Sequence, residues 1–252
     1  MPYAITLPLI TDSDASFPTA PHRALQGTLY AWLQQGDPDL AGCVHQLPGP
    51  KPFTVTPLSR RNGQPCYHFT LLDDALWPPL EAALSDGAQV EIVNQRWPVA
   101  QDGRQTEHCS YADLVANART ETGLAFRFLS PTSFRSQDMH YPLPDPVMAF
   151  QSWLSRWNAF APQDLRLNVN TLDLVAAHVA IARFRLETRA VTFDRYTQIG
   201  FVGTVTYRVI KSRLLGHDLI RRLNILADYA PFCGTGHKTT QGMGQTRRLE
   251  PR

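Results

Sequence analysis

Tyr30, His45 and Lys51 are the side chains with the clearest chemical potential, with fourteen residues between the first two and five between the last two. A phenol, an imidazole and an ammonium are the groups that metal-free RNA cleavage requires. One takes the proton of a ribose 2′-hydroxyl, another protonates the leaving 5′-oxygen, and the cation stabilises the phosphorane. Histidine suits either proton transfer because its ordinary pKa lies near neutrality, whereas that of tyrosine is about 10. The alternative is a core-edge tyrosine, a surface histidine and a solvated lysine.

A zinc site is a second interpretation of the same region. Cys43-Val44-His45 and Cys66-Tyr67-His68 repeat a Cys-x-His pattern, and His108-Cys109 follows later in the chain. This one-residue gap differs from the about two to four residues that usually separate the ligands of structural zinc sites. We therefore expect no metal and no other cofactor. The Gly-x-Ser-x-Gly elbow of serine hydrolases and the His-Glu-x-x-His helix of zinc proteases are both absent from the sequence.

A glycine-rich stretch near the C-terminus is the second candidate site. It holds four glycines within eleven residues: Gly234, Gly236, Gly242 and Gly244. Such a backbone can adopt left-handed conformations and lets a ligand approach its amides. Lys238 and Arg247 indicate that the ligand is an anion. The spacing fits neither a phosphate loop nor a dinucleotide fingerprint, and the alternative is a tight turn into a final strand.

The charges are divided unevenly along the chain. Residues 1–118 hold 6 basic and 12 acidic side chains, a net charge of −6, whereas residues 119–252 hold 18 basic and 10 acidic, a net charge of +8. Lysine occurs only three times in the whole chain, so the basic half is almost wholly arginine. Guanidinium groups bind phosphate through two hydrogen bonds and stack on bases, which favours a nucleic-acid partner.

Composition indicates a soluble cytoplasmic protein. No run approaches eighteen uninterrupted apolar residues, and the N-terminus lacks a basic-then-apolar export signal, so no membrane contact is expected. The four cysteines are scattered without a disulfide framework, which suggests free thiols in a reducing compartment.

The elements of the first half follow the order strand, helix, strand, strand, helix, strand. We expect them at residues 3–10, 22–35, 53–58, 67–72, 74–85 and 88–93. A polar loop ending at Pro21 separates the first two. Gly36-Asp37-Pro38 ends the first helix, and residues 40–51 are expected to be a loop at least in their second half. This order is the ferredoxin-like plan.

A similar pattern recurs in the second half. We expect strands at 124–128, 179–187, 190–194 and 199–209, helices at 146–157 and 212–230, and a short closing strand. Asp145-Pro146 is a typical helix start. The sequence therefore predicts an α+β protein of two tandem ferredoxin-like domains, at residues 1–118 and 124–252.

Several motifs together resemble one known family. Residues 226–236, with Gly242-Met243-Gly244 after them, match a helix followed by Gly-x-Gly, a five-residue gap and Gly-x-Gly. Residues 129–135 and 51–58 add supporting matches. The chain is similar over essentially its whole length to the CRISPR-associated endoribonucleases that cut repeat sequences of precursor CRISPR RNA, the Cas six group of the RAMP superfamily.

This resemblance implies two ferredoxin-like domains and cleavage without metal, leaving a 2′,3′-cyclic phosphate and a 5′-hydroxyl. By position His45 resembles the family's catalytic histidine in the loop after the first helix, Tyr30 a tyrosine of that helix, and Lys51 a lysine that begins the next strand. Residues expected to hold the RNA are Arg135, Gly234, Gly236, His237, Lys238, Thr239, Gly242, Gly244 and Arg247.

The expected partner is CRISPR repeat RNA in the precursor transcript. Other CRISPR effector subunits, and a monomeric or homodimeric state, are left open. The main alternative is a non-catalytic RNA-clamping subunit of a CRISPR effector complex, with the same folds and no nuclease activity.

Overall fold

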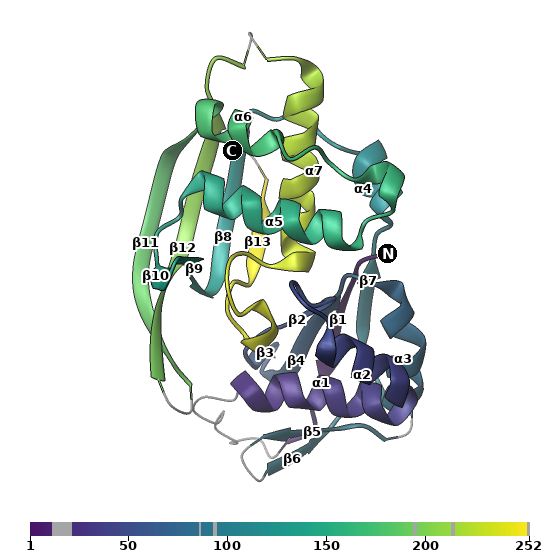
Figure 1. Ribbon diagram of the computed structural model, residues 1–252. Helices are drawn as coiled ribbons and strands as arrows, with labels where there is room; N and C mark the ends of the chain where they lie inside the picture. The colour runs from purple at the N-terminus through teal and green to yellow at the C-terminus, as the bar shows by residue number, and fades with distance from the viewer. Residues whose placement is uncertain (12–21, 86, 93–94, 194–195, 213–214, 251–252) are drawn as a thin grey trace.

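Two antiparallel sheets, one in each half of the chain, organise the fold (Figure 1). The computed structural model describes residues 1–11, 22–85, 87–92, 95–193, 196–212 and 215–250. The predicted polar loop up to Pro21 lies outside this set from residue 12 on, as do residues 213 and 214 of the predicted last helix. None of the helices described is both long and apolar enough to cross a membrane.

The N-terminal sheet has the strand order β2-β4-β1-β7, with β3 added to β4. Its strands are β1 (Tyr3–Pro8), β2 (Phe53–Val55), β3 (Ser59–Arg61), β4 (Gln64–Leu71) and β7 (Gln105–His108). The helices of this half are α1 (His22–Gly36), α2 (Pro38–Gln46) and α3 (Trp77–Ser85), the last preceded by the turn η1 (Asp74–Leu76). Leu29 and Leu33 of α1 share one core with Ile5 and Phe69 of the sheet, and all four are fully buried. The apolar stripe of α1 therefore decides which face meets the sheet.

The closing strand of the first half is not the predicted one. The segment 88–93 contributes β5 (Gln89–Ile92), which pairs with β6 (Gln95–Pro98) in a separate hairpin. The edge position beside β1 is taken by β7. All four residues of β7 are exposed and polar, so its pairing lacks the apolar alternation by which a strand is recognised in a sequence.

A helix replaces the first part of the predicted loop at 40–51. Asp37 accepts a hydrogen bond from the amide of Leu40 at 2.9 Å, and Pro38 occupies the first helical turn. The segment that ends α1 therefore also starts α2. His45 lies in the last turn of this helix and not in a loop, which corrects the expected placement.

The C-terminal sheet has the strand order β11-β12-β8-β13. Its strands are β8 (Gly123–Thr132), β11 (Val179–Phe193), β12 (Tyr196–Val209) and β13 (Thr246–Leu249), and a small hairpin joins β9 (Phe134–Ser136) to β10 (Met139–Tyr141). The helices are α4 (Tyr111–Ala116), α5 (Pro146–Phe160), α6 (Thr171–His178) and α7 (His217–Cys233), with the turn η2 (Gln163–Leu165). Phe126 packs between Trp153 and Tyr207, with ring centroids 5.0 and 5.9 Å away. Both strand orders confirm the predicted tandem ferredoxin-like fold.

The long hairpin of β11 and β12 was predicted only in part. One strand of fifteen residues, β11, covers the two short strands expected at 179–187 and 190–194. It pairs with β12 along its length and lies at the edge of the sheet. The next helix, α7, begins at His217 and not at Ser212.

Hydrogen bonds from the end of α7 and from the stretch that follows it join the C-terminal half to the N-terminal half. The Thr70 hydroxyl of β4 donates to the carbonyl of Phe232 at the end of α7, at 2.5 Å. The Gln26 side chain of α1 bonds to the side chains of Thr240 and Gln241 at 3.3 and 3.0 Å. The stretch between Gly234 and Gly244, called the glycine loop below, is therefore attached to the N-terminal half.

Two glycines allow the glycine loop to close on itself. Gly236 and Gly244 have φ angles of 78° and 73°, in the left-handed region. A β-carbon at Gly236 would collide with the carbonyl oxygen of Ser133, and one at Gly244 with that of Thr235. The amide of Thr235 donates to the carbonyl of Gly244 at 2.8 Å, which joins the two ends of the loop.

We predict that Gly244→Ala lowers the free energy of unfolding by roughly 2 kcal/mol more than Gly63→Ala, because it adds an overpacked contact to the strain of a left-handed alanine. Gly63 is the matched control, since its φ of 83° is similar but a β-carbon there meets no atom within 4 Å. Urea denaturation measures both variants. Equal losses would contradict the role assigned to the contact with Thr235.

Candidate nucleic-acid interface and active site

Tyr30, His45 and Lys51 are brought together at the end of α2. The rings of Tyr30 on α1 and His45 on α2 meet edge to face, with centroids 5.5 Å apart. Tyr30 also packs against Phe53 at 5.3 Å. His45 is exposed, so its imidazole is accessible from solvent.

Lys51 binds the C-terminal end of α2. Its ammonium donates to the carbonyls of Val44, His45 and Leu47 at 3.0, 2.9 and 2.7 Å. A helix end leaves carbonyls unsatisfied and carries partial negative charge, so a lysine there supplies both donors and a complementary charge. Because one of the three carbonyls belongs to His45, Lys51 fixes the backbone that carries the imidazole.

The protonation state of Tyr30 follows from its surroundings. Burial raises the pKa of the Tyr30 phenol above its ordinary value. The phenol is therefore protonated at neutral pH, and in that state it can donate a hydrogen bond but does not take up a proton.

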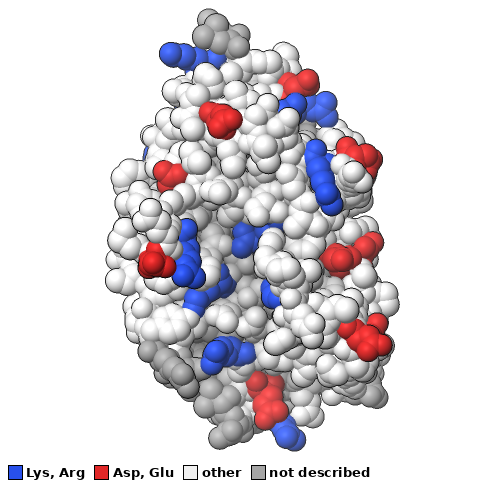
Figure 2. All heavy atoms as spheres, viewed as in Figure 1, with Lys and Arg blue, Asp and Glu red and all other residues white. Residues whose placement is uncertain are grey.

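A cleft of about 890 Å³ opens between α1 and α5. Lys51 lines it, whereas Tyr30 and His45 are not among its lining residues. Its described lining includes five cationic side chains from both halves of the chain: Arg23, Lys51, Arg135, Arg156 and Lys238. No carboxylate is among the described residues of its lining. Figure 2 shows Lys and Arg gathered in a hollow near the middle of this face, with acidic groups toward the edges. The cleft is therefore suited to a polyanion.

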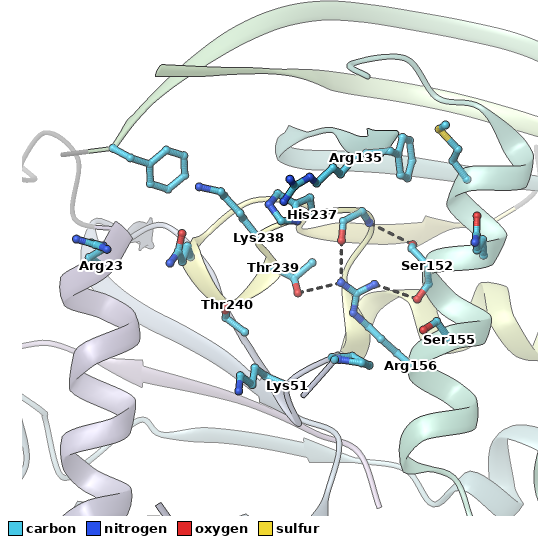
Figure 3. A pocket seen from close by; sticks show the side chains of 18 of the residues that line it. Arg23, Lys51, Arg135, Ser152, Ser155, Arg156, His237, Lys238, Thr239 and Thr240 are labelled. Carbon is cyan, nitrogen blue, oxygen red and sulfur yellow. Dashed lines mark hydrogen bonds between the residues drawn. The ribbon is translucent and has the colours of Figure 1, made fainter. Parts of the chain in front are cut away.

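Arg156 of α5 supports the glycine loop from below (Figure 3). Its guanidinium donates to the carbonyl of Gly236 at 2.7 Å and to the hydroxyl of Thr239 at 3.3 Å. The amide of Gly236 in turn donates to the hydroxyl of Ser152 at 3.1 Å. Burial lowers the pKa of the Arg156 guanidinium, yet arginine stays charged in proteins.

His237 lies near His140 and near two arginines of the cleft, Arg135 and Arg156. Its ring centroid is 6.0 Å from that of His140, and its amide donates to the carbonyl of Ser133 at 2.8 Å. Burial lowers the pKa of His237, and His140, Arg135 and Arg156 lower it further. The imidazole is therefore neutral at pH 7 when no anion is bound.

The residues expected to hold RNA divide into three groups. Five line the cleft: Arg135, Gly236, His237, Lys238 and Thr239. Gly234 and Arg247 instead line a second groove of about 320 Å³, to which both sheets contribute. Gly242 and Gly244 shape the glycine loop without lining the cleft. Two cleft residues that the sequence analysis missed are Arg23 and Arg156, which carry no local motif.

Arg247 of β13 lies directly opposite Arg127 of β8 in the antiparallel register. Like charges in this position repel. Both side chains are exposed. This pair adds positive charge to the C-terminal sheet beside the second groove.

The paired Cys-x-His motifs are not assembled into a metal site. Among the residues that the structure describes, no three His, Cys, Asp or Glu side chains form a group that could hold a metal ion. The His68 ring is hydrogen-bonded to the hydroxyl of Thr6 at 2.8 Å. Burial, aided by Arg61 and Arg247, lowers the pKa of His68 to about 4. The thiol of Cys66 is buried and donates to the carbonyl of Gln64.

Comparison with known proteins identifies relatives of this chain. The family model described as CRISPR-associated endoribonuclease Cas6 matches residues 126–246. A curated protein of that description from Streptococcus thermophilus is 26% identical over 132 residues, which are 52% of this chain and 53% of the relative. That match therefore spans about half the length of the curated relative.

Solved structures extend the likeness to the whole chain. A Cas6 product complex superposes with a TM-score of 0.85 at 29% identity and covers 99% of each chain. Thermus thermophilus Cas6 superposes with a TM-score of 0.75 at 29% identity, over 99% of this chain and 98% of its own. A second Cas6 product complex shares the fold, with a TM-score of 0.80 at 24% identity. That match covers 99% of this chain and 100% of the other. Together, the match to the family model in the C-terminal half and the end-to-end agreement with these structures show that the chain is similar to the CRISPR-associated endoribonucleases of the Cas6 family.

Proposed function

We propose that this protein is an endoribonuclease that cleaves CRISPR repeat RNA in precursor transcripts without a metal ion and so produces guide RNAs. The observation that carries the proposal is the position of Lys51, which both lines the cationic cleft and binds the backbone of His45. A polyanion bound in the cleft would thus reach the lysine that holds the backbone of His45, although the imidazole itself does not line the cleft. Similarity to Cas6 endoribonucleases supports an RNA substrate. The domains are assigned to residues 1–118 and 124–252, with α4 of the first domain packed on the core of the second.

The proposed reaction is an internal transfer of the phosphoryl group. The ribose 2′-oxygen attacks the phosphorus and loses its proton to a base, while the bond from phosphorus to the 5′-oxygen breaks and that oxygen gains a proton. The products are a 2′,3′-cyclic phosphate and a 5′-hydroxyl. His45 serves as general acid or base, and Tyr30, which burial keeps protonated, orients the 2′-hydroxyl or the phosphate by donating a hydrogen bond.

Lys51 stabilises the negative phosphorane through its charge, at a site whose described lining offers no carboxylate for a divalent cation. Its three bonds to α2 also position His45. Around the rest of the cleft, Arg135, Lys238 and Thr239 hold the RNA backbone, where contacts set register more than base preference.

Removing the imidazole tests the catalytic assignment. We expect His45→Ala to reduce the rate of cutting of a labelled repeat RNA by about 10²- to 10⁴-fold, because it removes a general acid or base, while RNA affinity is retained. Single-turnover assays in excess chelator measure the rate, and His217→Ala, at an exposed histidine that starts α7, is the control.

A 2′-deoxy substitution at the scissile nucleotide should block cutting completely. Cutting that requires magnesium would rule out the proposed chemistry. A parent chain that binds the repeat and never cuts it would instead support an RNA-clamping subunit.

The pH dependence separates hydrogen-bond donation by Tyr30 from proton removal. Because burial raises the pKa of this phenol above 10, it is protonated throughout the range from about pH 6 to 9. We therefore expect Tyr30→Phe to lower the rate by roughly 10- to 100-fold at every pH without changing the shape of the profile. Loss of a rising limb in the variant would show that the phenolate acts as the base.

Salt dependence tests the contact of Lys238 with the RNA backbone. We expect Lys238→Ala to weaken RNA binding and to reduce the slope of log affinity against log salt by about one, as for the loss of one phosphate contact. Lys211→Ala is the matched control, because Lys211 is an exposed lysine outside the cleft with a similar φ, 52° against 58°. Equal slopes for the two variants would contradict the assignment.

A further inference from the structure

The tip of the β11–β12 hairpin places two aromatic rings over the glycine loop. Phe193, the last residue of β11, and Tyr196, the first of β12, are paired in register and stacked, with ring centroids 5.2 Å apart and an interplanar angle of 25°. The Lys238 ammonium lies 4.0 Å from the centroid of Phe193 and 4.1 Å from that of Tyr196. All three residues line the cleft, at the side where Figure 3 shows Lys238 pointing away from Lys51.

The two rings differ in exposure. Phe193 is 5% exposed and packs with Val191 and Met243 in a small apolar cluster separate from the two main cores. Tyr196 is 48% exposed. The inner ring is therefore fixed by packing, and the outer ring rests on it with much of its surface open to the cleft. An aromatic ring that packing already holds in place before binding loses little conformational freedom when another ring stacks on it.

Lys238 places a positive charge against the two aromatic rings. Its backbone is left-handed, at φ 58°, which aims the side chain from the glycine loop toward the hairpin. In the part of the chain that the structure describes, no carboxylate forms an ion pair with this ammonium. A cation held by aromatic faces can still bind an anion, because the rings occupy only one side of it.

We propose that Tyr196 is a stacking platform for an unpaired nucleobase of the bound RNA, and that Lys238 holds the phosphate next to that base. The proposal rests on the proposed function in that the ligand is RNA. A base inside a stem already has both faces covered by its neighbours, whereas an unpaired base offers a free face. Tyr196 therefore selects single-stranded nucleotides at this end of the cleft.

A structural role for Tyr196, as a cover for Phe193, is the competing explanation. It predicts that substitutions at Tyr196 change stability and affect every RNA probe alike. A stacking role predicts a loss limited to probes that carry bases. Comparing the binding of an RNA with that of a ribose-phosphate backbone that lacks bases distinguishes the structural role from the stacking role.

The test measures fluorescence anisotropy of the full-length chain with a labelled 12-nucleotide oligoadenylate and with an abasic ribose-phosphate 12-mer. We expect the parent to bind oligoadenylate about tenfold more tightly than the abasic strand, in line with the usual worth of one stacked base. Tyr196→Phe keeps this preference, Tyr196→Trp increases it, and Tyr196→Leu removes it without changing the affinity for the abasic strand.

A Tyr196→Leu variant that retains the preference would overturn the proposal, as would a parent that binds both probes equally. Thermal unfolding shows whether Tyr196→Leu folds. If it does not, the preference of the Tyr196→Phe and Tyr196→Trp variants for oligoadenylate over the abasic strand tests the proposal. A preference for oligoadenylate that is not larger with tryptophan than with phenylalanine at this position then contradicts stacking. Both probes report binding and not cutting, so failure to cleave repeat RNA would count against the nuclease proposal alone.

Discussion

The docking of the glycine loop is the interaction on which the arrangement of the site depends. Arg156 binds the loop from α5 through Gly236, and Gln26 binds it from α1 through Thr240 and Gln241. The loop is thus held from both halves of the chain. This double attachment gives the cleft a fixed width, because neither wall can move without breaking hydrogen bonds to the loop between them.

The electrostatics of the cleft follow from the same arrangement. Packing has drawn Arg156, His237 and Lys238 partly out of water, and burial lowers the pKa of each. Bringing such groups together without carboxylates costs free energy in the unliganded protein. A bound polyanion would offset this cost, so part of the affinity would come from relief of repulsion that folding has imposed. Arginine, which cannot lose its proton, is suited to this position.

The fold could be predicted where apolar periodicity was strong, as for α1, β4, β12 and the greater part of α7. It could not be predicted for β7, since four exposed polar residues form a strand only because β1 offers an open edge. Residue type and spacing were enough to group Tyr30, His45 and Lys51 as one site. The helix that carries His45 was not predicted, because Pro38 was interpreted as the end of the preceding helix and not as the start of a new one. Arg23 and Arg156 belong to the cleft solely through tertiary packing, and Phe193 and Tyr196 are brought over Lys238 by a hairpin whose length the sequence analysis did not reveal.

The long outer strand β11 has a consequence for behaviour at high concentration. Fifteen residues of an unpaired sheet edge are a template on which another chain could build. Arg183, Arg185 and Arg189 are exposed along it, and Glu187 pairs with Arg189. A second copy laid antiparallel with Arg183 opposite Arg185 would bring guanidinium against guanidinium. The residues that make this half of the protein basic thereby disfavour such registers of strand addition at this edge.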